Sequence, residues 1–239
     1  MYSGKKIGVI IPAAGKGKRI GGKKSKQFLE LDGKPVLLHT IGRFEGMEEV
    51  DAVVLAVDPG SLRKTKDLIT KHGLKKISAV VEGGPERQDS VWNCLRAIKN
   101  QNIDIIMVHD AVRPFVSGAL ILSVLAACVR DPAVIPCVRP KDTIKESDDG
   151  IFIGRTPDRE NLWAAQTPQA FDFRLLYGAF EKAYRENIRC TDEAGLLERL
   201  GYRVRIISGS YDNIKITTPE DLQLAVLISK RMSGKKREC

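Results

Sequence analysis

Short apolar runs rich in Val and Ile alternate along the chain with longer stretches in which apolar residues recur every three or four positions. The short runs are typical of strands buried on both faces; they span residues 6–12, 52–57, 77–82, 103–109, 133–138 and 202–207. The longer stretches predict helices over residues 35–44, 59–72, 86–99, 117–130, 173–186 and 192–200, with a last helix that begins at Thr218-Pro219. Strands that alternate with helices predict an α/β fold, a Rossmann-like, mostly parallel sheet with helices on both faces. Ligands of such sheets bind at the carboxyl ends of the strands.

Residues 139–165 interrupt this alternation with polar sequence. The turn sequence Asp148-Asp149-Gly150 lies between two short β-prone runs, residues 143–146 and 151–153, an order typical of a β-hairpin. Because a hairpin of this size has little core of its own, we expect an inserted arm that protrudes and reaches across a dimer. The chain shows no internal repeat or linker, so residues 1–239 are interpreted as one domain that carries this arm.

The net charge of +9 is concentrated at the two ends of the chain. Residues 1–26 contain eight Lys or Arg and no acidic residue, residues 230–239 carry a net +4, and the sequence between them has a net charge of −3. Nucleic-acid-binding proteins usually spread basic residues over a face and place aromatic side chains among them. Aromatic residues make up 6% of this chain and none lies between residues 12 and 27, so we expect no nucleic-acid partner.

Other classes are excluded by what the sequence lacks. No apolar run approaches the roughly 18 residues of a membrane-spanning helix, and the N-terminus has no signal-peptide cleavage site. Five dispersed cysteines without a C-x-x-C pair, and three isolated histidines, match neither a disulfide framework nor a zinc site. We therefore expect a cytoplasmic protein with no membrane partner and no transition-metal centre.

The first apolar run leads into a loop of small and basic residues, 12–27. This loop fails the pattern G-x-G-x-x-G at Ile20, and it fails the P-loop pattern because Lys24 stands where a hydroxyl residue would bind magnesium. Small residues nevertheless let backbone N–H groups approach phosphate oxygens, and Lys and Arg neutralise phosphate charge. The loop therefore predicts a triphosphate site, with a solvated basic loop as the alternative.

Three further polar clusters fall at or near predicted strand ends: residues 82–90, 109–114 and 213–217. Taken alone, the first is equally typical of a turn followed by a helix cap. Asp110 in the second is suited to binding magnesium or a ribose, and also to preceding a helix. Lys215 in the third is suited to binding phosphate, although a Lys between apolar neighbours is often a surface strand residue.

These clusters carry a family resemblance when taken together. The motifs P-A-A-G-x-G-x-R with Lys26-Gln27, G-G-x-x-R-x-x-S, H-D-x-x-R-P, D-T-x-K, D-R-x-x-L-W-x-x-Q-T-P-Q, T-D-E-A and D-N-I-K-I-T-x-P-E-D-L occur in this order. With them the chain closely resembles the 2-C-methyl-D-erythritol 4-phosphate cytidylyltransferase family, over residues 7–228. The resemblance implies attack of the acceptor phosphate, in line, on the α-phosphorus of CTP, with release of pyrophosphate.

The resemblance also implies roles for individual residues. It assigns catalysis, through charge on the reacting phosphates, to Arg19, Lys26, Lys215 and Arg159. It assigns nucleotide binding to Ala13, Ala14, Gly15, Gly17, Gly84, Ser90 and Ala111. It assigns binding of the acceptor, a polyol phosphate, to Asp110, Arg113, Thr143, Arg159, Thr191 and Lys215. It further implies Mg²⁺ bound with CTP, Asp110 as the residue nearest the metal, and a homodimer in which Thr143 and Arg159 reach the neighbouring subunit's site.

Two alternatives remain open at this point. The nucleotide half of the chain is also similar to ribitol 5-phosphate cytidylyltransferases, and the region of Thr143 and residues 156–159 favours the methylerythritol branch. A basic nucleic-acid-binding module is the alternative from another class, and its binding would weaken steeply with salt. A nucleotide sensor without catalysis is disfavoured by Arg19, Lys26 and Lys215 together.

Overall fold

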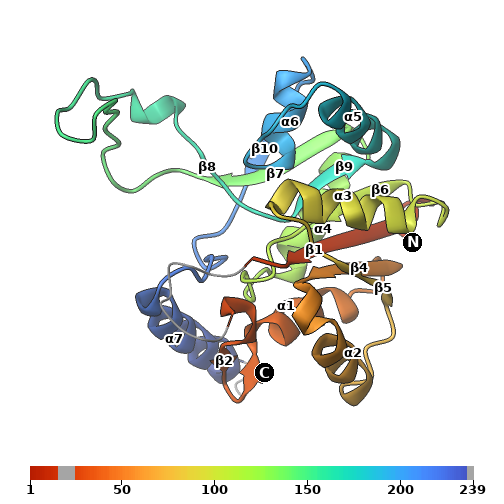
Figure 1. Cartoon of the computed structure of the whole chain (residues 1–239). Helices are drawn as coiled ribbons and strands as arrows, with labels where there is room; N and C mark the ends of the chain where they lie inside the picture. The colour runs from red at the N-terminus through yellow and green to blue at the C-terminus, as the bar shows by residue number, and fades with distance from the viewer. Residues whose placement is uncertain (16–24, 236–239) are drawn as a thin grey trace.

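The computed structural model describes residues 1–15 and 25–235 of the chain. Its central sheet has eight strands in the order β10-β7-β9-β6-β1-β4-β5, with β8 paired to β7 (Figure 1). These strands are β1 (Ile7–Ala13), β4 (Ala52–Val57), β5 (Ile77–Glu82), β6 (Ile105–Val108), β7 (Ala133–Val138), β8 (Ala164–Ala165), β9 (Gln169–Asp172) and β10 (Arg205–Ser208). Only the pairings of β8 and β9 are antiparallel among the described strands of this sheet. The expected mostly parallel α/β fold is confirmed.

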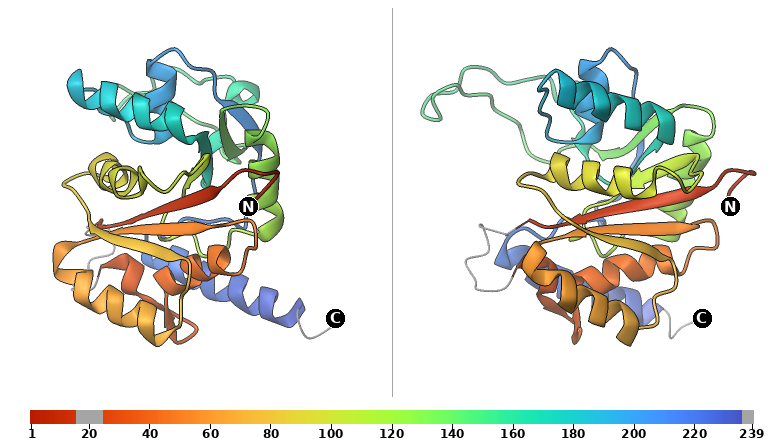
Figure 2. Two further views of the ribbon diagram at one scale, coloured as in Figure 1. Left: turned by 90° about the vertical axis from the view of Figure 1, so that its right-hand side faces the viewer. Right: turned by 45° about the vertical axis from the view of Figure 1, so that its right-hand side comes forward.

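Helices cover both faces of the sheet (Figure 2). They are α1 (Val36–Glu45), α2 (Leu62–Lys71), α3 (Arg87–Ile98), α4 (Gly118–Cys128), α5 (Phe173–Arg185), α6 (Glu193–Arg199) and α7 (Pro219–Lys235), with short 3₁₀ helices η1 (Lys26–Phe28), η2 (Pro59–Ser61) and η3 (Arg159–Asn161). Helices α3, α5 and α6 pack on one face, and α1, α2 and α4 pack on the other. A small antiparallel pair, β2 (Glu30–Leu31) and β3 (Lys34–Pro35), lies beside α7.

The sheet separates two hydrophobic cores, and residues of β1 contribute to both of them. The β1 residues Ile7, Val9 and Ile11 pack into the core with α1 and α4, whereas Ile10 packs into the core with α3 and α5. Since both faces are covered by helices, the strand is apolar at every position rather than at alternate ones. The buried strands hold the loops at their carboxyl ends in fixed places.

Polar side chains set where the helices begin. Ser117, Asp172 and Asp192 directly precede α4, α5 and α6, and each accepts a hydrogen bond from a backbone N–H of the first helical turn. Such caps satisfy donors that have no partner inside the helix. Outside the arm, the predicted helices and strands are all present, with ends displaced by at most three residues.

Two parts of the sheet were not predicted from the sequence. Strand β9 inserts antiparallel between β6 and β7, and β8 adds two residues to β7. In β9 the apolar residues Ala170 and Phe171 are flanked by Gln169 and Asp172 and follow Pro168, so the run is too short to give a strand pattern.

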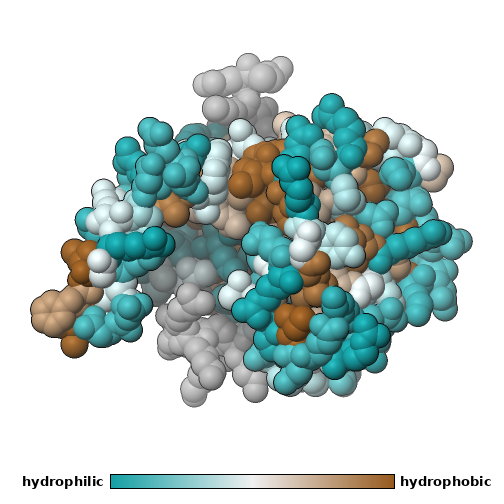
Figure 3. Space-filling model, turned by 90° about the horizontal axis from the view of Figure 1, so that it is seen from above, coloured by the Kyte–Doolittle hydropathy of each residue, from teal (hydrophilic) through white to brown (hydrophobic). Residues whose placement is uncertain are grey.

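The segment 139–165 extends away from the body of the molecule, at the upper left of Figure 1. Gly150 turns the chain with φ of +71°, and the Asp149 carboxylate accepts hydrogen bonds from the backbone N–H groups of Ile151 and Phe152. The turn is thus where the sequence predicts it, but the two β-prone runs do not form strands: the single bridge joins Glu146, at the end of the first run, to Arg155, two residues beyond the second. Nothing within the described chain covers the arm's apolar tip, which stands out in brown at the left of Figure 3.

No helix within the described residues has the length and apolar character that crossing a membrane would require.

Candidate functional site

A pocket of about 820 Å³ opens at the carboxyl ends of β1, β4, β5 and β6. In the sheet order, β1 lies between β4 and β6, so the connections leave it in opposite directions and open a crevice, where α/β sheets bind ligands. Its lining residues come from the loops after these strands and from the segment before α7: Pro12, Ala13, Ala14, Gly15, Lys26, Gln27, Asp58, Pro59, Gly83, Gly84, Pro85, Glu86, Arg87, Ser90, Asp110, Ala111, Val112 and Lys215.

The structure brings most of the predicted site residues together in this pocket. Those that line it are Ala13, Ala14, Gly15, Lys26, Gly84, Ser90, Asp110, Ala111 and Lys215. Arg113 lies directly behind the pocket, where it contacts Asp110. Thr191 lines a second cavity, and Thr143 and Arg159 lie on the arm. Gly17 and Arg19 fall outside the described residues.

Two loops approach each other so closely that only glycine fits between them. A Cβ atom placed on Gly83 would lie 2.1 Å from the Cβ of Ala14, and one on Gly84 would lie 2.2 Å from the Cβ of Asp89. Ser90 fixes the second loop, because its Oγ accepts from the N–H of Gly84 and donates to the carbonyl of Glu86. Residues of both loops, Ala14 and Gly15 on one side and Gly83 and Gly84 on the other, line the pocket.

Lys26 and Lys215 enter the pocket from well-fixed segments. Lys26 begins η1, and the neighbouring Gln27 is buried and donates to the carbonyl of Ala13 at 2.6 Å. Lys215 precedes α7, whose first turn is capped by the Asp221 carboxylate accepting from the backbone N–H groups of Thr217 and Thr218. The predicted Lys215 is therefore a pocket residue rather than part of a surface strand.

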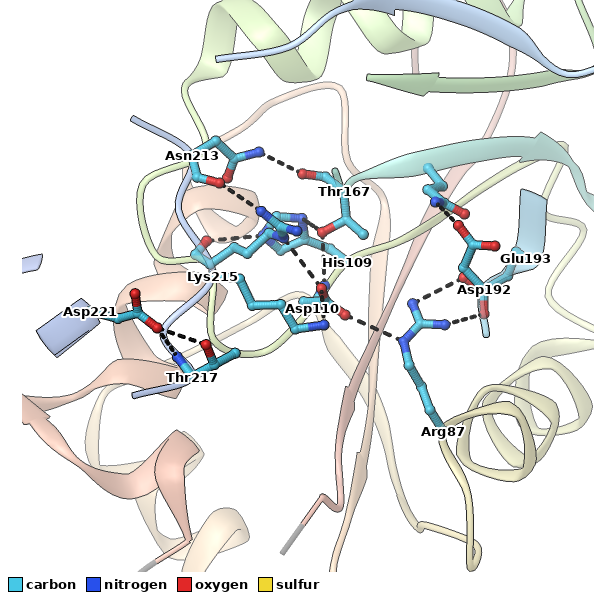
Figure 4. A network of polar contacts seen from close by, with 12 residues as sticks. Arg87, His109, Asp110, Thr167, Asp192, Glu193, Asn213, Lys215, Thr217 and Asp221 are labelled. Atoms are coloured by element: carbon cyan, nitrogen blue, oxygen red, sulfur yellow. Dashed lines mark hydrogen bonds and ion pairs between the residues drawn. The ribbon is translucent and has the colours of Figure 1, made fainter. Parts of the chain in front are cut away.

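Asp110 lies at the centre of a charged network (Figure 4). Its Oδ1 contacts Nε of Arg87 at 3.3 Å, and its Oδ2 contacts Nζ of Lys215 at 3.0 Å and Nε of Arg113 at 3.3 Å. Burial alone would raise the pKa of Asp110, but Arg87, Lys215 and Arg113 hold this pKa well below its ordinary value. The carboxylate is therefore ionised at neutral pH and orients three cations around the pocket.

Arg87 also binds a second carboxylate. Its Nη1 and Nη2 donate to the two carboxylate oxygens of Glu193 at 2.7 and 3.0 Å, and the Glu193 side chain is 2% exposed. Burial would lower the pKa of Arg87, but Glu193 and Asp110 raise it above its usual value. Sequence reasoning assigned no role to Arg87 or Glu193, although both stand inside motifs that were identified, G-G-x-x-R-x-x-S and T-D-E-A.

His109 and Thr167 hold the backbone of Asp110 in place. Nε2 of His109 lies 3.0 Å from the carbonyl oxygen of Arg113, so it must carry the proton and donate. Nδ1 then accepts from the hydroxyl of Thr167, whose oxygen accepts the N–H of Asp110. Burial lowers the pKa of His109 to about 4, which keeps the ring neutral and this assignment of protons fixed.

The pocket suits a magnesium ion only as a companion of phosphates. Mg²⁺ usually keeps several waters and uses one or two protein carboxylates beside substrate phosphates. Both oxygens of Asp110 already contact cationic side chains. Among the residues that the structure describes, no three His, Cys, Asp or Glu side chains gather to hold a metal. Asp110 is therefore the one predicted metal-binding carboxylate that lines the pocket beside Lys26 and Lys215.

A second cavity of about 460 Å³ lies beside the segment that leads into α6. Its lining residues are Arg189, Cys190, Thr191, Gly195, Glu198 and Arg199. Two arginines and a Thr hydroxyl give it the character of a phosphate or polyol subsite. Of the predicted acceptor residues on the body of the chain, Thr191 is the one found here.

Comparisons with known proteins agree with this geometry. The model of the family described as 2-C-methyl-D-erythritol 4-phosphate cytidylyltransferase (IspD) matches residues 7–231. Curated proteins of that name from Alkaliphilus oremlandii (strain OhILAs) and Geobacillus kaustophilus (strain HTA426) are 44% and 43% identical over 226 and 225 residues. Each match covers 94% of this chain, and 95% and 97% of the respective relative.

Solved structures give the same result. The 4-diphosphocytidyl-2C-methyl-D-erythritol synthase of Anaerococcus prevotii DSM 20548 superposes with a TM-score of 0.83 and 33% identity, over 95% of this chain and 100% of that one. A 2-C-methyl-D-erythritol 4-phosphate cytidylyltransferase from Thermus thermophilus gives 0.78 and 34%, over 93% and 98%.

Proposed function

This chain belongs to the 2-C-methyl-D-erythritol 4-phosphate cytidylyltransferase family, and from that premise we propose that the strand-end pocket is where its reaction takes place. The reaction transfers the cytidylyl group of CTP to the phosphate of 2-C-methyl-D-erythritol 4-phosphate and releases pyrophosphate. The comparisons do not favour ribitol 5-phosphate as the acceptor. The observation that carries the proposal is that Lys26 and Lys215 line one pocket with Ala13, Ala14 and Gly15.

The charges around Asp110 suit a polyphosphate. Three cations, Arg87, Arg113 and Lys215, face two carboxylates, Asp110 and Glu193, which leaves a net positive charge beside the pocket. Transfer of a phosphoryl-type group needs alignment and charge stabilisation more than covalent help. Lys215 orients the reacting phosphates, and Lys26, with Arg19, stabilises negative charge that grows in the transition state as the acceptor oxygen attacks in line.

Backbone groups would recognise the nucleotide. The residues given this role are Ala13, Ala14, Gly15, Gly17, Gly84, Ser90 and Ala111. The close approach of Gly83 to Ala14 brings two loops of N–H and carbonyl groups to one side of the pocket, where they match the edge of a cytosine ring. Asp110 and Arg113 position the ribose and acceptor side of the site, and Thr191, which lines the second cavity, contributes to holding the acceptor.

The arm completes the site of a neighbouring subunit. Its tip exposes Ile151, Phe152 and Ile153 at 77%, 75% and 64%, and such an apolar patch on a segment without a core calls for a partner surface. Thr143 and Arg159 lie on this arm and outside their own chain's pocket. In the proposed homodimer, each of them reaches the acceptor bound to the partner.

The cofactor and compartment follow from the substrates and the thiols. Mg²⁺ would be held by Asp110 together with the CTP phosphates, and when bound it spreads the triphosphate charge. The four cysteines within the described residues are all free thiols, which accords with a reducing compartment such as the cytoplasm.

Substitution of Lys26 tests the site assignment. Lys26→Ala should lower kcat about 100- to 1,000-fold, the usual cost of losing one group that stabilises transition-state charge, and should weaken CTP binding only about threefold or less. Lys71→Ala, at the exposed end of α2 outside the pocket, is the matched control and should match the wild type. Equal losses of kcat and CTP affinity in Lys26→Ala would contradict the proposed role.

A further inference from the structure

We propose that Arg87 is a positioning residue for the acceptor subsite, which it serves by holding the carboxylates of Asp110 and Glu193 in one fixed arrangement. The inference rests on the proposed function and adds to it a residue pair, Arg87 with Glu193, that acts as a unit. Arg87 is the first residue of α3, Asp110 follows β6, and Glu193 is the first residue of α6. One guanidinium therefore joins three elements that are far apart in the sequence.

All three nitrogen atoms of the Arg87 guanidinium make a contact. Nη1 and Nη2 form a two-pronged contact with Glu193, at 2.7 and 3.0 Å, while Nε contacts Asp110 at 3.3 Å (Figure 4). Such parallel contacts fix orientation as well as distance, and a Lys ammonium cannot reproduce them. Because Arg87 holds Oδ1 of Asp110, Oδ2 is turned toward Lys215 and Arg113.

Other residues in the first turn of α3 form hydrogen bonds with residues 188–190, the segment that leads to Thr191. The Gln88 side chain donates to the carbonyl of Ile188 at 3.0 Å and accepts the N–H of Cys190 at 2.9 Å. Arg189 donates to the Asp89 carboxylate at 2.6 Å. These contacts lie immediately before Thr191 in the chain, and Arg87 adds the contact to Glu193 just beyond it.

The nucleotide subsite depends on the same helical turn. Ser90, on α3, holds Gly84 by the hydrogen bond from the Gly84 N–H, and both residues line the pocket. Because Ser90 holds the nucleotide loop without Arg87, this loop keeps its support when the Arg87 contacts are removed. The contacts of Arg87 lead instead to Glu193 and, through Asp110, to Lys215.

This arrangement predicts a loss that is specific to the acceptor. Without the Arg87–Glu193 contact, the segment at 188–193 keeps its backbone contacts to Gln88 but loses the fixed side chain at its carboxyl end. A misplacement of the acceptor phosphate slows transfer steeply, because in-line attack depends on alignment. The backbone groups that would recognise the nucleotide are not touched by this loss.

The test is a double-mutant cycle with Arg87→Met and Glu193→Gln. Each single variant should lower kcat/KM for 2-C-methyl-D-erythritol 4-phosphate about tenfold or more. Because the two residues act as a unit, kcat/KM of the double variant should lie within about threefold of that of the less active single variant. The dissociation constant for CTP, measured by calorimetry without acceptor, should change less than about threefold. Arg96→Met, on the exposed side of α3, is the matched control and should keep wild-type kinetics.

Several outcomes would overturn the inference. Losses that multiply in the double variant would make the two residues independent, and unchanged acceptor kinetics in the singles would make the contact merely structural. An equal loss of CTP affinity would place Arg87 in the nucleotide subsite alone. Glu193→Gln keeps the side-chain shape without the charge, so its kinetics decide the question if Arg87→Met fails to fold. A wild-type enzyme that is inactive with this substrate pair would overturn the proposed function and this inference together, whereas active wild type with unaffected variants overturns the inference only.

Discussion

Charged groups surround the buried carboxylate of Asp110, and each of them has a counter-charge or a hydrogen-bond partner. The Asp110 and Arg113 side chains are each 10% exposed and Glu193 is 2% exposed. A buried carboxylate without a partner would cost several kcal/mol, so Asp110 and Glu193 each depend on the cations beside them. His109 stays neutral beside Asp110 because burial lowers its pKa, and this outweighs the hydrogen bond to the carbonyl of Arg113, which raises it.

The neutral His109 makes stability depend on pH. Between pH 6.5 and about 4 the unfolded chain takes up a proton at His109 while the folded protein does not, so the unfolding free energy should fall as the pH is lowered. The loss across this window is on the order of 3 kcal/mol. Denaturant unfolding at pH 7.5, 6.0 and 4.5 measures it. His109→Gln should show a shallower decline, and an identical decline in both proteins would rule out His109 as the cause.

The sequence identified site residues that stand in local motifs, but it did not identify residues whose role depends on a partner far away in the chain. Lys26, Asp110 and Lys215 were predicted because each stands in a motif at a strand or loop end, and the pocket contains all three. The pairing of Arg87 with Glu193 spans 106 positions, and nothing in residue type or spacing specifies which distant carboxylate a given Arg will meet.

At the scale of elements, the close packing of the loops after β1 and β5 determines the pocket. The strands and helices with long, regular apolar patterns were predictable. Strand β9 was not, since its short run of Ala170 and Phe171 becomes a strand only through its neighbours β6 and β7. The arm shows the converse case: Asp149 and Gly150 specify the turn locally, but strand pairing needs a covering layer, and only the bridge from Glu146 to Arg155 forms.

The loop contact predicts the effect of adding one methyl group. Gly83→Ala would place a Cβ 2.1 Å from the Cβ of Ala14, so the two loops must separate, and the KM for CTP should rise about tenfold or more. The matched control is Gly42→Ala in α1, where a Cβ meets no atom within 4 Å. That control should keep its kinetics and gain up to about 1 kcal/mol of stability. An unchanged KM for CTP in Gly83→Ala would show that the loops do not hold the nucleotide.

At the scale of the whole molecule, the arm and the pocket of one chain lie apart. Figures 1 and 2 show the arm pointing away from the body, while the pocket lies at the ends of the central strands. Thr143 and Arg159 lie on the arm and do not line the pocket of their own chain, which is the basis for proposing that they serve a second copy. The apolar tip of the arm is exposed and supports the same proposal.

This arrangement predicts complementation between two inactive variants. Arg159→Ala and Lys26→Ala, unfolded together and refolded as a mixture, should recover about a quarter of wild-type activity, because half of the dimers are hybrids and each hybrid has one intact site. Each variant alone, taken through the same procedure, is the control. Verified hybrid dimers without recovered activity would show that Arg159 serves its own chain.

The most direct test of the whole account is pyrophosphate release by the purified protein with CTP and Mg²⁺, with either 2-C-methyl-D-erythritol 4-phosphate or ribitol 5-phosphate as the acceptor. We predict release with the first acceptor and none above background with the second, and Lys215→Ala should abolish most of it. Release with ribitol 5-phosphate alone, or with neither acceptor, would contradict the assignment of this pocket to methylerythritol phosphate cytidylyl transfer.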